Sequence, residues 1–397
     1  MKPEKIFAII FLVLGCVFAI QFFREWISLD STGDAAWNRS VPMYTDLGPS
    51  VTREYLYKLS VEDSILGAPY RLYPVKTGKF NATLIEYPFG SSPRTVKDSV
   101  SETVPEDSSV VNETRKIKGA VIYMHGLNDY FYQTELAEKS DSAGYAFFAI
   151  DLHNYGRSYK KGDRRCDMFD IREFYGELDI AISMVRRIVG EYTPIVFIGH
   201  SQGGLFWPLY LNDRPDANFA AVVLNSPFLE MNFPAFLRKT AIPLLAYAGH
   251  YFPNISIGST GNTHSAYAVH VSGIGEWNYD LRLKPFVRPP TYLSWVNAIH
   301  RGHEHLHGGL NLKMPVLVMQ SDCSVNKSVW DEAYTHCDGV LDVELIREMS
   351  SKLGSNVTDV EIAGGMHDLF LSKKPVRDAA YDAAFKFIDE SLVGSRQ

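Results

Sequence analysis

Short apolar runs alternate with amphipathic stretches along most of the chain, beginning at Gly119. The apolar runs are residues 119–126, 145–152, 194–201, 219–227, 314–320 and 356–365, and the amphipathic stretches are 133–144, 170–190 and 378–392. This alternation predicts an α/β fold in which helices cover a mostly parallel sheet. Within 170–190, apolar residues recur in steps of three and four and predict one helix face against the sheet: Ile171, Phe174, Leu178, Ile182, Val185 and Val189.

The alternation stops between residues 228 and 313, a segment rich in aromatic residues, proline and glycine, and resumes after it. We therefore expect a lid over 228–313, inserted into a single domain over 51–397. Upstream, residues 53–61 and 81–89 alternate like the strands of an antiparallel hairpin. Residues 90–116 are poor in large apolar residues and rich in Ser, Glu and Asp, which predicts a mobile surface insertion.

The start of the chain has the pattern of a membrane segment. Two lysines precede an apolar run from Ile6 to Phe23, which is long enough to span a bilayer and lacks the small-residue ending of a cleaved signal. This predicts a signal anchor over 1–30 and a tether over 31–50, with the catalytic domain on the extracytoplasmic side of the membrane. A secreted protein released by signal cleavage and lipidation at Cys16 are the alternatives.

Composition adds three constraints. The chain has 397 residues, 46% of them hydrophobic, enough for one large globular domain. Its net charge of -7 comes from mixed acids and bases without a basic stripe, which indicates that nucleic acid is not a partner, and nothing in the sequence identifies a protein partner. Six N-x-[ST] sequons agree with an extracytoplasmic domain, at Asn38, Asn81, Asn112, Asn254, Asn326 and Asn356.

The segment TPIVFIGHSQGG, residues 193–204, places a G-x-S-x-G motif directly after a predicted buried strand. At such a turn the middle residue, here Ser201, adopts a strained conformation that projects its side chain above the sheet. Side chains at Gly199 or Gly203 would collide with neighbouring backbone. The motif predicts a nucleophilic serine, which needs a histidine to take its proton.

The order of catalytic residues in α/β-hydrolases is serine, acid, histidine, with the histidine on a loop after the last strand. His367 has this position among twelve histidines, and Gly364 and Gly365 allow its loop to turn back toward Ser201. Two backbone N–H groups are expected to meet the oxyanion. We expect one from Gln202 and the other from Leu127, which follows the first parallel strand.

Four motifs, in this order and on these elements, resemble the monoacylglycerol lipase/lysophospholipase branch of the α/β-hydrolases, whose domain is often labelled serine aminopeptidase: HGLND at 125–129, DLHNYGRS at 151–158, GHSQGG at 199–204 and GGMHD at 364–368. The resemblance extends from about Gly119 to the C-terminus. The sequence departs from the family pattern at Asp129, where Glu is usual, and at Asn154-Tyr155, where Gly-His is commoner. The resemblance implies an esterase with a lid over an acyl pocket, and neither a metal nor an organic cofactor.

The resemblance also implies a triad carboxylate a few residues after the strand at 314–320, and two aspartates compete. Asp322 follows the strand at once, whereas Asp338 matches the family pattern but comes sixteen residues later. A disulfide between Cys323 and Cys337 would close the intervening excursion at its base and bring Asp338 to the family position. We favour Asp338 as the acid, with Asp322 as a structural carboxylate that caps the loop.

One other constellation suggests different chemistry. His303, Glu304 and His307 form an H-E-x-x-H pattern typical of zinc proteases, but glycines end that helix abruptly and no third ligand follows. A solvated, histidine-rich end to the lid is the preferred interpretation. The remaining extracytoplasmic cysteine, Cys166, is interpreted as a buried or idle thiol.

The leading hypothesis is a membrane-anchored serine hydrolase of carboxylic, lipid-like esters, in which Ser201 is acylated, His367 transfers the proton and Asp338 supports His367. An aminopeptidase of the same fold is the alternative and needs acids for the substrate amino group, for which Glu230 and Glu276 are available. A catalytically silent receptor or adhesion domain is a third hypothesis. Such domains usually lose the serine or the histidine, and both are present.

Overall fold

The computed structural model describes residues 47–48, 50–92, 116–259 and 263–394. The predicted signal anchor lies outside the described residues, as do most of the predicted tether and most of the insertion expected at 90–116. Within the described part of the chain, no helix combines the length and the apolar character needed to cross a bilayer.

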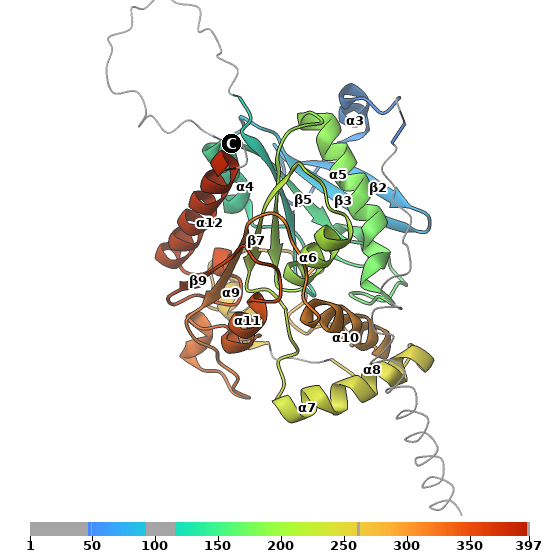
Figure 1. Cartoon of the computed structure of the whole chain (residues 1–397), viewed down its shortest axis with the longest axis vertical. Coiled ribbons are helices and arrows are strands. Elements are labelled where there is room, and N and C mark those ends of the chain that lie inside the picture. Colours follow the sequence, from blue (N-terminus) through green and yellow to red (C-terminus); the bar gives the residue numbers. More distant parts are fainter. Residues whose placement is uncertain (1–46, 49, 93–115, 260–262, 395–397) are drawn as a thin grey trace, which may run out of the picture.

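The described strands form one sheet whose order is β1-β2-β3-β5-β4-β6-β7-β8-β9 (Figure 1). In this order, the strands β5, β4, β6, β7, β8 and β9 run parallel to one another. At the other edge, β1 pairs with β2, β2 with β3 and β3 with β5, all antiparallel. The mostly parallel sheet predicted from Gly119 onward is confirmed. The strands are Val61–Glu62 (β1), Arg71–Thr77 (β2), Phe80–Tyr87 (β3), Gly119–Met124 (β4), Tyr145–Asp151 (β5), Ile195–His200 (β6), Phe219–Asn225 (β7), Val316–Ser321 (β8) and Val357–Ile362 (β9).

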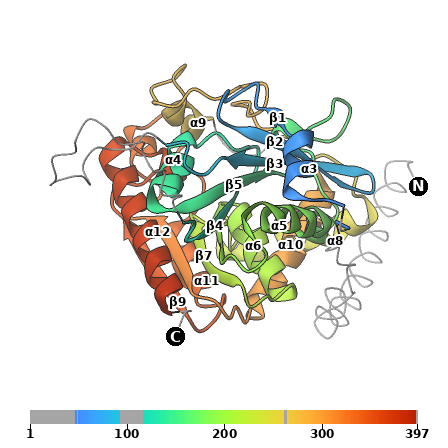
Figure 2. The same cartoon turned by 90° about the horizontal axis from the view of Figure 1, so that it is seen from above.

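Helices cover both faces of the sheet (Figure 2). Helices α4 (Thr134–Ala143) and α12 (Lys374–Gly394) pack on one face, and α5 (Tyr175–Val189), α6 (Gly203–Asp213), α10 (Leu293–His307) and α11 (Val343–Ser350) belong to the other. Successive residues of β4 point to opposite faces of the sheet. Val121 and Tyr123 join the core under α4 and α12, whereas Ile122 and Met124 join the core under α5, α6 and α10. The helix face predicted within 170–190 packs on this sheet, with Val189 partly buried and the other five residues buried.

The hairpin prediction near the N-terminus is wrong in its first half. Residues Arg53–Leu59 form helix α3, and the antiparallel partner of β3 is β2. The Thr52 side chain accepts a hydrogen bond from the N–H of Tyr55 and caps the helix, and Leu56 is its only buried residue. The apparent alternation of apolar residues therefore did not reflect a buried strand face.

The segment predicted as a lid, 228–313, contains α7 (Ala235–Lys239), α8 (Ala241–Tyr251), α9 (His264–Val269) and α10. It connects β7 to β8 and does not extend the sheet. Helix α10 contributes Trp295, Ile299 and Leu306 to the main core, whereas α7 has no buried residue. In Figure 1, α7, α8 and α10 lie together along the lower edge of the molecule. The insertion is thus partly a core element and partly an exposed layer.

Candidate active site

The serine predicted as nucleophile lies on the turn between β6 and α6. Ser201 has φ 52°, the left-handed conformation expected for this turn. A Cβ on Gly199 would lie 2.5 Å from the carbonyl oxygen of Gly203, and one on Gly203 would lie 2.6 Å from that of Met124. Side chains at both positions would therefore collide with backbone, as the motif predicts. The Ser201 N–H donates to the Asn225 carbonyl at 3.0 Å, which ties the turn to β7.

Three side chains from distant parts of the chain meet at this turn. The Nε2 atom of His367 is 3.0 Å from Oγ of Ser201, and its Nδ1 atom is 2.9 Å from Oδ2 of Asp338. Asp338 is fully buried, and its other oxygen accepts the N–H groups of Val340 and Leu341, each at 2.8 Å. These distances are those of a hydroxyl, its base and the carboxylate that orients the base.

The two candidate acids have different partners. Asp322 is exposed, and its Oδ1 atom accepts the N–H of Gly364 at 2.9 Å, in the loop before His367. This is the structural role that the sequence suggested for it. The structure contains the Cys323–Cys337 disulfide, which closes the excursion before Asp338. Of the two carboxylates, Asp338 is the one hydrogen-bonded to His367.

The two expected oxyanion donors flank Ser201. Gly126 packs so closely that a Cβ on it would lie 3.0 Å from the Cβ of Ser201, which brings the loop of Leu127 to the nucleophile. The Gln202 side chain is fixed by Tyr155 and by Trp295, at 2.8 and 3.2 Å. Within the described residues, neither the Leu127 N–H nor the Gln202 N–H donates a hydrogen bond. Both N–H groups are therefore without a partner among the described residues.

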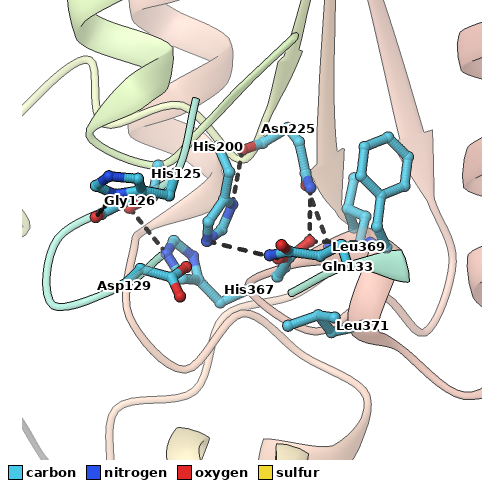
Figure 3. Close-up of polar contacts among 12 residues, drawn as sticks. His125, Gly126, Asp129, Gln133, His200, Asn225, His367, Leu369 and Leu371 are labelled. Carbon is cyan, nitrogen blue, oxygen red and sulfur yellow. Dashed lines mark hydrogen bonds and ion pairs between the residues drawn. The ribbon is translucent and has the colours of Figure 1, made fainter. Parts of the chain in front are cut away.

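A buried polar network supports the loop of His367 (Figure 3). The carboxylate of Asp368 accepts hydrogen bonds from the side-chain amides of Asn225 and Gln133, at 2.7 and 3.1 Å, and the Asn225 amide oxygen accepts the N–H of Leu369. Burial raises the pKa of Asp368. The network was missed by sequence reasoning. Its only signals were the aspartate after His367 and the asparagine that ends a predicted strand.

The histidine next to the nucleophile is not placed to act as its base. His200 is buried, and its ring nitrogen Nδ1 is 3.2 Å from the Asn225 carbonyl oxygen, to which it donates. Burial lowers its pKa to about 3, so the ring is neutral at physiological pH. The Ser201 hydroxyl is hydrogen-bonded to Nε2 of His367 instead.

An ion pair joins the loop after β4, which contains Leu127 and Asp129, to the insertion. The ammonium of Lys284, between α9 and α10, lies 2.8 Å from Oδ1 of Asp129, and both side chains are largely buried. Lys284 also donates to the hydroxyl of Tyr132 at 2.9 Å. Asp129 is the residue at which the HGLND motif departs from the family pattern, so this departure coincides with an attachment point for the insertion.

The zinc-protease pattern on α10 has another role. The Nε2 atoms of His303 and His307 are 2.9 and 3.0 Å from the carbonyl oxygens of Phe228 and Leu229, to which they donate. Within the described residues, no group of three or more metal-ligating side chains is gathered at one place. The prediction of a solvated, histidine-rich end to the lid is wrong for His303. This side chain is buried, and burial lowers its pKa to about 3. These histidines attach α10 to the segment that follows β7.

Cys166 is buried, as expected for a structural thiol, and burial raises its pKa to about 12. It lines a cavity of about 10 Å³ together with Leu127, Trp295 and residues 288–292. This volume is close to the minimum that holds one water molecule. Because Ser201 is itself only 8% exposed, the site is nearly closed in this conformation.

The two acids considered for binding a substrate amino group already have cationic partners. Glu230 lies 2.7 Å from a guanidinium nitrogen of Arg238, and Glu276 lies 2.7 Å from one of Arg377. Glu276 also lies in the outer groove between α4 and α12. Neither carboxylate is hydrogen-bonded to a residue of the triad.

Comparisons with known proteins identify the family and the fold. Residues 115–374 match the family described as serine aminopeptidase, S33. Among solved structures, the fold is similar to a monoglyceride lipase from Saccharomyces cerevisiae (15% identity, TM-score 0.57, covering 83% of this chain and 97% of that one). It is also similar to a monoacylglycerol lipase from Paleococcus ferrophilus (19% identity, TM-score 0.51, covering 70% of this chain and 96% of that one). A third similar structure is a carboxyl esterase from Bacillus coagulans (14% identity, TM-score 0.50, covering 81% of this chain and 99% of that one). No curated protein matches the sequence.

Proposed function

The chain belongs to the serine aminopeptidase, S33, family of α/β-hydrolases, and from this we propose that it is a serine hydrolase that cleaves lipid-like carboxylic esters, of the monoacylglycerol or lysophospholipid type. One observation carries the proposal. The hydroxyl of Ser201, on its strained turn, is hydrogen-bonded to His367, which is hydrogen-bonded to the buried carboxylate of Asp338.

The reaction follows from these contacts. As Oγ of Ser201 attacks the ester carbonyl carbon, Nε2 of His367 takes its proton, and Asp338 stabilises the imidazolium that forms. The N–H groups of Leu127 and Gln202 meet the developing oxyanion. Collapse of the tetrahedral intermediate expels the alcohol, which takes the proton from His367 and leaves an acyl-enzyme. Water then attacks the acyl carbon with His367 as base, and the acid is released.

The ester class is supported from two sides. The structurally similar proteins are named as lipases and an esterase, and an aminopeptidase would need a carboxylate free to bind the amino group of its substrate. Glu230 and Glu276 are both held by arginines. The lipid character is supported by aromatic and aliphatic side chains exposed on the insertion, including Phe236, Leu244 and Phe252.

The same proposal includes a membrane-anchored enzyme whose catalytic domain faces the extracytoplasmic side. The apolar run from Ile6 to Phe23 supports the anchor. A disulfide is typical of oxidising compartments, and the sequon asparagines Asn254, Asn326 and Asn356 are exposed. Protease protection of the full chain in sealed vesicles tests this topology. Digestion of the catalytic domain from the cytoplasmic side would contradict it.

We also propose that the outer part of 228–313 acts as a lid. The support is that Ser201 is nearly covered and that the cavity beside Leu127 is close to the size of one water, so an acyl chain requires a wider opening. Crosslinking α8 to α10, which lie side by side, provides a test. A disulfide between introduced cysteines should slow turnover of long-chain esters more than that of an acetate ester.

Two assays test the function itself. A fluorophosphonate probe should label the full chain at Ser201 and should not label the Ser201→Ala variant. A p-nitrophenyl ester series of increasing chain length, set beside a series of aminoacyl amides, then separates an esterase from an aminopeptidase. Turnover of the amides above that of the esters would overturn the proposed chemistry, and absence of both labelling and turnover would favour a silent binding domain.

A further inference from the structure

The excursion between the two disulfide-bonded cysteines ends at the triad acid. Cys323 lies two residues after β8, Cys337 lies fourteen residues later, and Asp338 follows Cys337 directly. The N–H of Asp338 donates to the Cys323 carbonyl, and the Val325 N–H donates to the Asp338 carbonyl, both at 2.8 Å. The backbone of the acid is thus paired with the chain on either side of Ser324, and the disulfide closes this pairing covalently.

The same disulfide shares an apolar cluster with the loop of the catalytic histidine. A small apolar cluster contains Cys337, Val325, Tyr334, Met366 and Ala268 of α9, with Cys323 packed against it. Met366 immediately precedes His367, just as Cys337 immediately precedes Asp338. The cluster therefore lies beside both partners of the hydrogen bond between Nδ1 of His367 and Oδ2 of Asp338.

Beyond Val325, the contacts that join Lys327 to Tyr334 and Asp331 in the excursion do not involve Asp338. The Tyr334 hydroxyl accepts the N–H of Lys327 and donates to its carbonyl, and the Lys327 ammonium pairs with Asp331. Trp330 packs against Tyr267 of α9. If the disulfide opens, these contacts keep the excursion folded, while its base and Asp338 are held by hydrogen bonds and packing alone, without a covalent link.

We propose that the Cys323–Cys337 disulfide is a positioning element of the active site, which holds the carboxylate of Asp338 at His367 and so sets kcat. This inference rests on the proposed hydrolase function. Reduction by a dithiol breaks the S–S bond, gives two cysteine thiols and oxidises the dithiol to its own disulfide. The Cys323 side chain is partly exposed, so such a reagent can reach the bond.

The first test uses the full chain in detergent, with dithiothreitol as the reductant and a p-nitrophenyl ester as the substrate. As two additional thiols appear per chain, kcat per fluorophosphonate-labelled site should fall by roughly 10- to 100-fold, the loss typical of a displacement of about 1 Å in a catalytic group. KM should change by less than about threefold, and reoxidation should restore kcat. Unchanged kcat per labelled site after both thiols have appeared would overturn the inference.

A second test uses substitutions and distinguishes positioning from general stability. The Cys323→Ser/Cys337→Ala double variant should lose kcat per labelled site, with KM changed by less than about threefold. In an Asp338→Asn background the same cysteine changes should alter kcat per labelled site by less than about twofold. Equal losses in both backgrounds would show a role that does not act through Asp338.

The outcomes also separate this inference from the proposed function. Ester turnover by the oxidised native chain, with no change on reduction, leaves the hydrolase function in place and removes the positioning role. Absence of ester turnover by the oxidised native chain contradicts the proposed function itself. If the double variant does not fold, reduction of the folded native chain still decides the question.

Discussion

The turn that carries Ser201 is built by one short stretch of chain, residues 195–213, and is tied to β7 by a backbone hydrogen bond, whereas Asp338 and His367 reach it on two loops, 29 residues apart from each other and, for His367, 166 residues from the serine. In the first region, glycines allow close backbone approach and a strand runs directly into a helix. In the second, the geometry depends on a disulfide, a small apolar cluster and a buried polar network. A nucleophile can be encoded locally, but its activation requires tertiary structure.

Removal of the local element should have the largest effect. The Ser201→Ala variant keeps the turn but has no hydroxyl, so kcat should fall on the order of 10⁶-fold, as for other serine hydrolases that lose the nucleophile. Steady-state assays of purified protein provide the measurement, and circular dichroism should show an unchanged fold. Residual turnover within about tenfold of native would mean that another group carries the reaction.

The next largest effect should separate the two candidate acids. Asp338→Asn places an amide against Nδ1 of His367 and disfavours the tautomer that accepts the serine proton, so kcat should fall by on the order of 10⁴-fold. Asp322→Asn is the matched control. It removes charge from a loop cap, and kcat should stay within about threefold of native. Reversed results for the two variants would assign the acid to Asp322.

The buried network behind His367 should show an intermediate effect. In Asp368→Asn the new amide faces the donating amides of Gln133 and Asn225, which disturbs the loop that carries His367. We expect kcat per labelled site to fall by roughly 10- to 100-fold with KM nearly unchanged. Asp378→Asn, on the outer side of α12 in a surface ion pair, is the control and should leave kcat within about twofold. A loss confined to melting temperature would assign Asp368 a structural role alone.

The smallest effect concerns stability and pH. Burial lowers the pKa of His303 to about 3, below the value of about 6.5 expected for an unfolded chain. Between these values the unfolded state binds more protons, so the free energy of unfolding should decrease as pH falls from 6.5 toward 3, at a rate of up to about 1.4 kcal/mol per pH unit from this residue. Urea unfolding at pH 7 and pH 5 measures this decrease. The slope should be smaller in His303→Gln, and an equal slope would exclude His303 as the cause.

Particular residues show how far the sequence could be followed. The strands from β4 to β9, the face of α5 and the turn at Ser201 were predictable because each depends on periodicity or on sterics between near neighbours. Helix α3 was misread as a strand because its alternation of apolar residues is accidental and its cap at Thr52 was overlooked. The buried contacts of His303 and His307 were also missed, since their carbonyl partners come from a segment more than seventy residues away.

The sequence by itself determined the chemistry available: a serine on a strained turn, a histidine on a late glycine-rich loop and two aspartates that compete as its partner. Only the tertiary structure decided that Asp338 is hydrogen-bonded to His367 and that Asp322 accepts the N–H of Gly364 in the loop before it. The same holds for Asp368, whose hydrogen bond with Asn225 anchors the loop of His367 to β7. The reason is physical. A turn depends on the backbone within a few residues, whereas a hydrogen bond of 2.9 Å between two loops depends on how the sheet, the disulfide and the buried network are assembled together.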